Sequence, residues 1–258
     1  STSMTFFRVF VPVAILLIYF GWKKVKLFRG NYKIMLIASG LNAARMFLYM
    51  VAYRYTSIGN AVILLFTWPI FATIFGAIFL KEKVSKRTAL LIGMAFLGIV
   101  VMYFNKEINF GSNDFIGMGA MLLSAIIFSI TAVIFKKELQ NYSEPETIFY
   151  QNLVGAIVFL PFIFINRPLP TVTQTSVASV YGLLVGVAAF LLFFYGLKKL
   201  KMSHYSLFTY WEIPAALIFS VIFFKEVITL NMIFGGVLII IAGLLLRREK
   251  QTVKNGKS

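Results

Sequence analysis

Cysteine is absent from the 258 residues, and histidine occurs only once, as His204. Without cysteine the chain has no disulfide, no thiolate metal site and no cysteine nucleophile. A single histidine argues against a histidine-rich metal centre and against Ser-His-Asp catalysis. The sequence also lacks the G-x-x-x-x-G-K-[ST] loop that binds nucleotide phosphates. We therefore expect no cofactor and no metal site.

Charged residues are scarce as well, at 13% of the chain, whereas hydrophobic residues make up 60%. Ordinary soluble domains carry about 25% charged and about 45–50% apolar residues. The mean hydropathy of +0.86 likewise excludes a soluble domain and indicates an integral membrane protein. The 9 Asp and Glu are outnumbered by 25 Lys and Arg. In a membrane protein this excess indicates topology rather than a nucleic-acid partner.

Long apolar segments fill most of the chain. A helix needs about 20 mostly apolar residues to cross a hydrocarbon core of about 30 Å. The segments do not show the alternating polarity of barrel strands, so we interpret them as helices. The sequence predicts an all-α membrane protein with nine visible spans, at residues 5–22, 33–55, 58–80, 88–104, 114–135, 147–165, 175–197, 204–224 and 230–246.

An internal repeat relates the two halves of the chain. A shift of 144 residues aligns KEKV at 81–84 with KEVI at 225–228 and superimposes three pairs of spans. The span at 114–135 has no partner in the first half, so we expect a tenth helix upstream of residue 1. Two five-helix repeats, each with an odd number of spans, are inverted in the membrane. The predicted parts are a first repeat without its first helix (1–113), a second repeat (114–246) and a cytoplasmic tail (247–258).

Positive charge divides unevenly between the two ends of the predicted spans. With alternating spans, 19 of the 25 Lys and Arg fall on one side, in the segments 23–33, 81–87, 136–137, 198–201 and 247–257. Positive loops lie in the cytoplasm. We therefore expect a multi-pass protein of the plasma (inner) membrane, surrounded by lipid, with its C-terminus in the cytoplasm.

Three segments carry a resemblance to a known family. They are FFRVFVPVAILLIYF (6–20), AYRYTSIGNAVILLFTWPIFATIFGAIFLKEK (52–83) and LKKLKMSHYSLFTYWEIPAALIFSVIFFKEV (197–227). With them the chain resembles the EamA-type transporters of the drug/metabolite transporter superfamily over essentially its whole length. The resemblance implies ten helices, a central cavity and alternating access by rocking of the repeats. It implies a small-molecule substrate, such as an amino acid, amine, nucleoside or drug-like solute, moved by proton coupling or exchange.

One position departs from the family pattern. Members often carry Glu directly before Pro in the ninth span, whereas Ile213 separates Glu212 from Pro214 in this chain. The insertion predicts a bend displaced by one residue. Because the first family helix often contributes to the substrate cavity, we also expect the candidate residues found in this sequence to be an incomplete set.

Arg45 lies near the middle of a predicted span, about 15 Å from either interface. A charge at that depth costs at least about 2.5–3.5 kcal/mol. Asn42, Tyr49 and Tyr53 share its helix face, because they lie at helical spacings from it. We expect this face to line a wet cavity and to bind substrate. A structural ion pair or a snorkelling side chain is the alternative.

Glu212 is the acidic counterpart, about 12 Å into the span that begins at His204. A carboxyl group at this depth can take up and release a proton, so we expect it to couple substrate movement to a proton gradient. Tyr205 lies on the same helix face. A structural hydrogen bond to the other repeat is the alternative. Pairing of Glu212 with Arg45 in one transport state is a further hypothesis.

Aromatic residues and prolines meet near the middle of two spans. Trp68, Trp211 and Tyr210 are candidates for an aromatic box around a cationic or ring-bearing substrate. Packing between helices explains such aromatics equally well. Pro69 and Pro214 are expected to kink or break their helices and to act as hinges.

Smaller polar groups complete the candidates. Thr67 is a small polar group expected near the substrate path, with helix–helix hydrogen bonding as the alternative. Gln151 and Asn152 open the span at 147–165, where an ordinary interfacial start is the alternative. Glu82 and Glu226 adjoin lysines at span ends, so we expect them to orient loops or to gate by ion pairing.

Three classes of function remain open from the sequence. A secondary transporter of a small organic metabolite is the leading interpretation. An integral membrane enzyme acting on a lipid-linked substrate is the second, although no paired carboxylates or histidine cluster support it. A membrane scaffold is the third, and it predicts that Arg45 and Glu212 are replaceable. Within the spans, Gly93, Gly98, Gly236 and Gly243 are expected to let helices pack closely.

Overall fold

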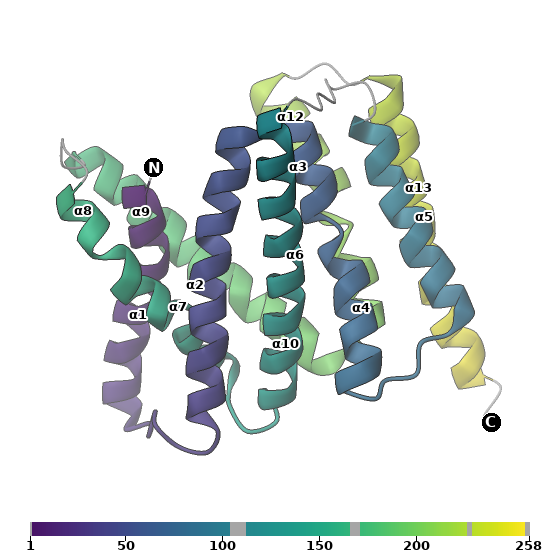
Figure 1. Cartoon of the computed structure of the whole chain (residues 1–258). Coiled ribbons are helices and arrows are strands. Elements are labelled where there is room, and N and C mark those ends of the chain that lie inside the picture. Colours follow the sequence, from purple (N-terminus) through teal and green to yellow (C-terminus); the bar gives the residue numbers. More distant parts are fainter. Residues whose placement is uncertain (1, 104–111, 166–170, 226–228, 256–258) are drawn as a thin grey trace. The chain divides into compact units, whose positions relative to one another are not determined.

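The computed structural model describes residues 2–103, 112–165, 171–225 and 229–255. Within these ranges every regular element is helical, which confirms the all-α prediction (Figure 1). In chain order the elements are α1 (Thr2–Lys23), α2 (Tyr32–Tyr55), α3 (Ile58–Leu65), α4 (Trp68–Phe79), α5 (Lys86–Tyr103), α6 (Ser112–Glu138), α7 (Glu144–Phe159), α8 (Pro161–Ile165), α9 (Val172–Leu183), the π-helical turn η1 (Leu184–Ala189), α10 (Phe190–Lys199), α11 (Met202–Thr209), α12 (Glu212–Phe224) and α13 (Leu230–Asn255).

Most of the predicted spans are long enough to cross a bilayer. Among the described residues, seven helical segments have the required length and apolar composition, and Leu230–Leu246 is a shorter apolar helix. The predicted span at 147–165 is divided, because α7 ends at Phe159 and α8 begins at Pro161. α13 runs on to Asn255, so the helix continues into the segment expected to be a tail.

Side-chain caps fix where several of these helices begin. Ser57 precedes α3 and accepts a hydrogen bond from the backbone N–H of Asn60. Ser143 with Glu146 forms a capping box at the start of α7, and Thr171 forms one at the start of α9. Such caps satisfy backbone N–H groups that have no partner within the helix. Local sequence therefore sets the ends of these helices.

The chain divides into two compact units, and each draws on both halves of the sequence. The first comprises residues 1–46 and 131–199, and the second comprises 47–130 and 200–258. The boundaries fall inside α2 and α6. The expected division into sequence repeats at 1–113 and 114–246 thus differs from the division into compact units. Those repeats stay a prediction.

In the first unit, α1 packs against α7 and α9. Two glycines allow the close approach of α1. A Cβ atom on Gly186 would lie 2.5 Å from Cγ of Pro12, and one on Gly182 would lie 3.0 Å from the carbonyl oxygen of Phe7. Gly186 belongs to the π-helical turn η1, so the irregular turn is placed where the two backbones meet.

Polar contacts tie the α1–α2 connection to the start of α7. The guanidinium Nη2 of Arg29 donates to both carboxylate oxygens of Glu146, at 3.0 and 3.2 Å. The hydroxyl of Tyr142 donates to the carbonyl oxygen of Arg29. Gly30 follows with a φ of +55°, a left-handed conformation that favours glycine. Burial alone would raise the pKa of Glu146, but hydrogen bonds from Ser143 and Arg29 outweigh it and lower that pKa.

We expect Arg29→Gln to make the protein less stable at neutral pH and less sensitive to acid. The folded-state pKa of Glu146 lies below its ordinary value of 4.5, so the ionised carboxylate stabilises the fold above that pH. This stabilisation disappears as the pH falls through the lowered pKa. The melting temperature of the purified protein should therefore drop less in the variant than in the wild type between pH 7 and about pH 3. An equal drop in both proteins would contradict the ion pair.

A matched control is available in the same unit. Lys198 pairs with Glu144 at 3.2 Å, but both side chains are partly exposed, at 38% and 22%. Exposed ion pairs contribute only about 0–1 kcal/mol. Lys198→Gln should therefore change the acid-dependent drop in melting temperature less than Arg29→Gln does.

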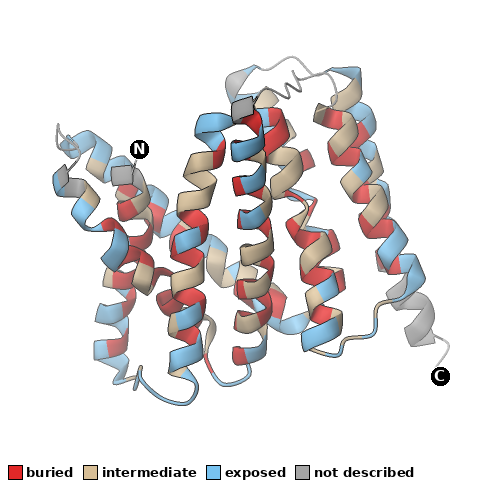
Figure 2. Cartoon of the chain, in the orientation of Figure 1, coloured by how far each residue is buried: buried red, intermediate tan, exposed pale blue. Residues whose placement is uncertain are grey.

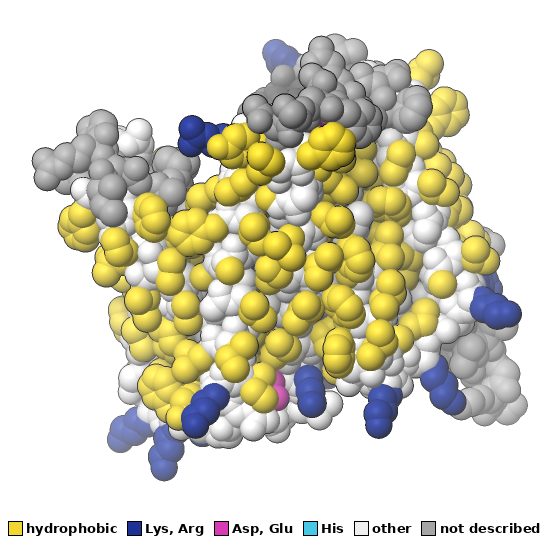
Figure 3. Space-filling model, viewed as in Figure 1, with side chains coloured by type: hydrophobic (Ala, Val, Ile, Leu, Met, Phe, Trp, Pro, Cys, Tyr) yellow, Lys and Arg dark blue, Asp and Glu magenta, His cyan; other side chains and the backbone are white. Residues whose placement is uncertain are grey.

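In the second unit, α5 packs along α13, and α4 packs against α11. Buried apolar residues lie where these helices meet, and Figure 2 marks the buried residues in red. Many of their exposed positions are apolar too, and Figure 3 shows hydrophobic side chains along the visible helices. One buried core cluster of this unit consists of Phe66, Leu91, Ile92, Ala95, Ile99, Met102, Leu207, Tyr210, Ile213, Ile239, Ala242 and Leu246.

Two broken helices of the second unit correspond under the 144-residue shift. The segment Ile58–Leu65 (α3) maps onto Met202–Thr209 (α11), and the starts of α4 and α12, at Trp68 and Glu212, map onto each other. Proline is the second residue of α4 but the third of α12. The break therefore keeps its place although Pro214 lies one residue later than its counterpart Pro69, so the expected displacement of the bend does not occur.

Candidate functional site

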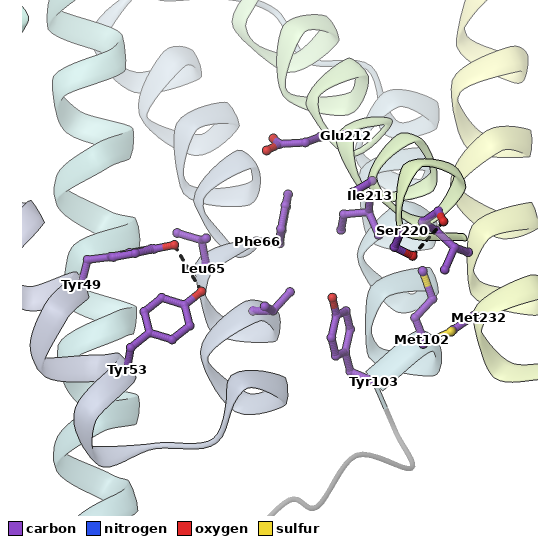
Figure 4. A pocket seen from close by; sticks show the side chains of 13 residues that line it. Tyr49, Tyr53, Leu65, Phe66, Met102, Tyr103, Glu212, Ile213, Ser220 and Met232 are labelled. Carbon is purple, nitrogen blue, oxygen red and sulfur yellow. Dashed lines mark hydrogen bonds between the residues drawn. The ribbon is translucent and has the colours of Figure 1, made fainter. Parts of the chain in front are cut away.

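A cavity of about 330 Å³ lies within the second unit. It is bounded by α2, α3, α5, α12 and α13, next to the break that separates α11 from α12. Figure 4 shows Tyr49 and Tyr53 projecting from α2 on one side, with Tyr103 and Glu212 on the other. The lining residues are Tyr49, Tyr53, Val62, Leu65, Phe66, Met102, Tyr103, Glu212, Ile213, Ala216, Leu217, Ser220 and Met232.

Glu212 supplies the cavity with its acidic group. It is the first residue of α12, and its side chain is exposed to the cavity. Among the described residues, none forms a hydrogen bond or ion pair with it. The 13 lining residues include no Lys, Arg or His. A carboxylate without a counter-charge inside a membrane protein is costly, so it marks a candidate functional group.

Tyrosines form the polar wall opposite Glu212. The hydroxyl groups of Tyr49 and Tyr53 are 3.2 Å apart, and one donates to the other. Their rings meet edge to face, with centroids 4.7 Å apart. This geometry leaves ring faces as well as hydroxyl groups along the cavity wall. The two tyrosines predicted from the helix face of Arg45 are thus brought together with Glu212.

The helix breaks beside the cavity are joined by one hydrogen bond. The hydroxyl of Tyr210 donates to the carbonyl oxygen of Phe66 at 3.0 Å. Phe66 follows α3 and Tyr210 follows α11, and they are equivalent under the 144-residue shift. A break releases backbone carbonyls that must be satisfied inside the protein. The side chain from one break thus satisfies the backbone of the other.

We expect Tyr210→Phe to destabilise the protein by about 1–3 kcal/mol, because it leaves the Phe66 carbonyl oxygen buried without its donor. The ring itself is retained, so packing should change little. Thermal unfolding of the purified variant measures the effect. Tyr181→Phe is the control, because Tyr181 is 50% exposed on α9. Equal melting temperatures for the two variants would show that the bond contributes nothing.

Arg45 lies in the first unit, at its boundary within α2. It is 8% exposed, and its Nε donates to Oδ1 of Asn42 at 3.2 Å. Nδ2 of Asn42 in turn donates to the backbone carbonyl oxygen of Gln151 at 3.1 Å. The side-chain oxygen of Gln151 is buried without a hydrogen-bond partner. Three predicted residues therefore form one buried polar cluster, but none of them lines the cavity.

The other predicted aromatic residues lie outside the cavity lining. Trp68 is buried and packs edge to face against Phe128, with ring centroids 4.7 Å apart. The indole of Trp211 faces Gly243, where a Cβ atom would lie 2.0 Å from its Nε1. Tyr205 is buried within α11. These positions favour the alternative that the aromatic residues pack between helices. Glu212, the residue after Trp211, does line the cavity.

Local hydrogen bonds engage two further candidates. Thr67 donates from Oγ1 to the carbonyl oxygen of Leu64 at 2.6 Å, so it caps the end of α3. Asn152 donates to the carbonyl oxygen of Ile148 within α7. Both bonds stay within three or four residues along the chain.

Glu82 contacts the start of a broken helix. Its carboxylate accepts a hydrogen bond from the backbone N–H of Met202 at 2.6 Å. Met202 is the first residue of α11, so a negative side chain lies at a helix N-terminus, where it is favourable. This contact fits the expected role in orienting the loop. The repeat counterpart, Glu226, lies outside the described residues.

Several cavity residues escaped the sequence-based prediction. Tyr103 closes α5 and resembles an ordinary interfacial anchor, and Phe66 resembles any apolar residue of a span. Met102, Met232 and Ser220 give no distinctive signal in sequence. The repeat shift offered one usable hint, because it pairs Phe66 with Tyr210.

Apolar helices, two of them broken beside a cavity that an acidic side chain lines, are the features of a membrane transport protein. Residues 1–104 and 115–248 match the model of the EamA-like transporter family. The chain belongs to this family.

Named relatives support the same class. The chain is 25% identical over 213 residues to the uncharacterized transporter YoaV of Bacillus subtilis, covering 81% of this chain and 72% of the relative. It is 25% identical to the S-adenosylmethionine uptake transporter of Rickettsia prowazekii, covering 99% and 86%. It is 23% identical to the pseudopaline exporter CntI of Pseudomonas aeruginosa, covering 97% and 87%. A solved crystal structure shares the fold, with a TM-score of 0.82 at 19% identity over 96% of this chain and 88% of that one.

Proposed function

We propose that this protein is a secondary active transporter that moves a small organic metabolite through the cavity of the second unit by alternating access. The observation that carries the proposal is the pair of equivalent helix breaks beside a cavity with an unpaired carboxylate. Membrane transporters bind substrates at such discontinuous helices. Relatives named for S-adenosylmethionine uptake and pseudopaline export support a small-molecule substrate.

Glu212 is the proposed coupling residue. In this role its carboxyl group takes up and releases a proton as the cavity opens to opposite sides of the membrane. The breaks at Phe66 and Tyr210 act as the hinges, since backbone hydrogen bonding is already interrupted there. Arg45, with Asn42 and its link to Gln151, keeps α2 and α7 in register within the first unit.

The proposed setting is the plasma (inner) membrane, with the C-terminus in the cytoplasm. The excess of Lys and Arg in alternate connections supports this orientation. The inverted repeats at 1–113 and 114–246 belong to the same proposal. The matching bounds of α3 with α11 support them.

The test is transport by the full-length protein in proteoliposomes. Radiolabelled amino acids, amines and nucleosides are screened at two external pH values, with a pH gradient imposed and then collapsed. We expect at least one solute to accumulate above protein-free liposomes, and more so with the gradient. Absence of flux for every solute, from protein that remains folded, would contradict the transporter proposal. Flux that ignores the gradient would contradict proton coupling alone.

A further inference from the structure

The chemistry of the cavity wall narrows the substrate class. Among the described residues that line it, Glu212 is the only charged one, and three tyrosines, one phenylalanine and two methionines line it as well. We propose that the cavity binds an organic cation with an apolar or aromatic body, whose positive group lies between the Glu212 carboxylate and the ring faces of Tyr49 and Tyr53. This inference rests on the proposed transport function.

Charge balance is the first argument. Among the described residues, Glu212 has no hydrogen-bond or ion-pair partner, and the 13 that line the cavity include no basic side chain. A bound cation would neutralise the carboxylate, whereas an anion would meet an unbalanced like charge in surroundings of low dielectric. Phosphorylated solutes and carboxylic acids without an amine therefore fit poorly.

Aromatic geometry is the second argument. Tyr49 and Tyr53 meet edge to face, so their rings present differently oriented faces near one point. Tyr53 is 37% exposed and Phe66 also lines the cavity, so ring surface is available to a ligand. Ring faces attract cations, most strongly where the contact is desolvated. The hydroxyl pair adds acceptor oxygens for an ammonium N–H group.

The apolar part of the wall completes the fit. Met102 and Met232 present flexible, polarizable side chains, and Leu65, Ala216 and Leu217 are apolar. The volume of about 330 Å³ lies at the lower end of the range for small-molecule sites. A compact amine or quaternary ammonium compound with one ring matches both the volume and the lining.

Equilibrium binding tests the inference with probes that differ in charge. Full-length protein in lipid nanodiscs is titrated by calorimetry with benzyltrimethylammonium, phenethylamine, phenethyl alcohol and phenylacetate, and empty nanodiscs correct for partitioning. We expect both cations to bind at least about tenfold more tightly than the alcohol and the acid. Tighter binding of phenylacetate, or equal binding of all four, would overturn the proposal.

Variants locate the binding site. Glu212→Gln should reduce the preference for benzyltrimethylammonium over phenethyl alcohol to within about threefold, with little effect on the alcohol itself. Glu144→Gln removes the same charge outside the cavity and should leave the preference unchanged. Tyr53→Leu should weaken cation binding more than Tyr53→Phe, which keeps the ring. The two Tyr53 variants test the proposal even if Glu212→Gln does not fold. An undiminished preference for cations in Tyr53→Leu would contradict a contribution from the Tyr53 ring.

The binding and transport experiments distinguish the cation inference from the proposed transport function. Selective cation binding without flux of any solute would support the cavity chemistry and contradict the proposed function. Flux of an acidic or neutral solute without selective cation binding would support the function and contradict the cation inference.

Discussion

Gly235→Ala is expected to destabilise the protein strongly, whereas Gly236→Ala should leave it at least as stable as the wild type. A Cβ atom on Gly235 would lie 2.2 Å from the carbonyl oxygen of Gly98 and 2.3 Å from Cγ of Met102. The first of these atoms is backbone, so α5 and α13 must separate to admit a methyl group. Overpacking of this kind costs typically about 1–3 kcal/mol, and contact with backbone favours the upper end.

The neighbouring glycine makes the control unusually close. A Cβ atom on Gly236 would meet nothing within 4 Å, and alanine favours a helix more than glycine does. Both variants add one methyl group to α13, at adjacent positions. Melting temperatures and the monodisperse yield of the purified proteins measure the difference. Equal stability of the two variants would contradict the close contact between α5 and α13.

The same two glycines show that sequence alone did not predict which glycine of α13 contacts α5. The sequence indicated close packing at Gly93, Gly98, Gly236 and Gly243, and the structure confirms it at Gly98 and Gly243. The partner of Gly98 is Gly235, one residue from the glycine named in advance. Adjacent helical residues point about 100° apart, so the register of a contact depends on how the helices pack.

Other parts of the fold were accessible from sequence because they depend on local chemistry. Helical spans follow from the length of apolar segments, and Pro69 and Pro214 indicated breaks in two of them. The breaks lie before Trp68 and Glu212, without the displacement expected from the position of Pro214. The hydrogen bond between Tyr210 and Phe66 was not predictable. A repeat identifies equivalent residues, but only the packing of the two broken helices brings these two together.

In the candidate site, too, the sequence indicated some residues, whereas the role of others depends on helix packing. Depth and helix face indicated Glu212, Tyr49 and Tyr53, and these residues share the cavity. Depth within the span could not predict that Glu212 lines the cavity while Trp68, its counterpart in the repeat, does not. Trp68 is packed against Phe128. An aromatic residue can line a cavity or fill a core, and the neighbouring helix decides which.

Glu212→Gln is expected to reduce proton-driven solute flux by about 10- to 100-fold. Glutamine keeps the size and hydrogen-bonding capacity of the side chain but carries no charge and cannot release a proton. The loss corresponds to about 1.4–2.8 kcal/mol, similar to a hydrogen bond with a charged group. Initial uptake rates in proteoliposomes, at equal protein incorporation and an imposed pH gradient, measure it. The residual flux should no longer respond to the gradient.

The control for this prediction comes from the cavity wall itself. Ser220 lines the cavity, but its hydroxyl donates to the carbonyl oxygen of Leu217 within α12. Ser220→Ala should therefore retain most of the flux and its response to the gradient. If both variants transport like the wild type, the carboxylate is not the coupling group. If both lose flux equally while Glu144→Gln does not, the cavity shape rather than the charge of Glu212 limits transport.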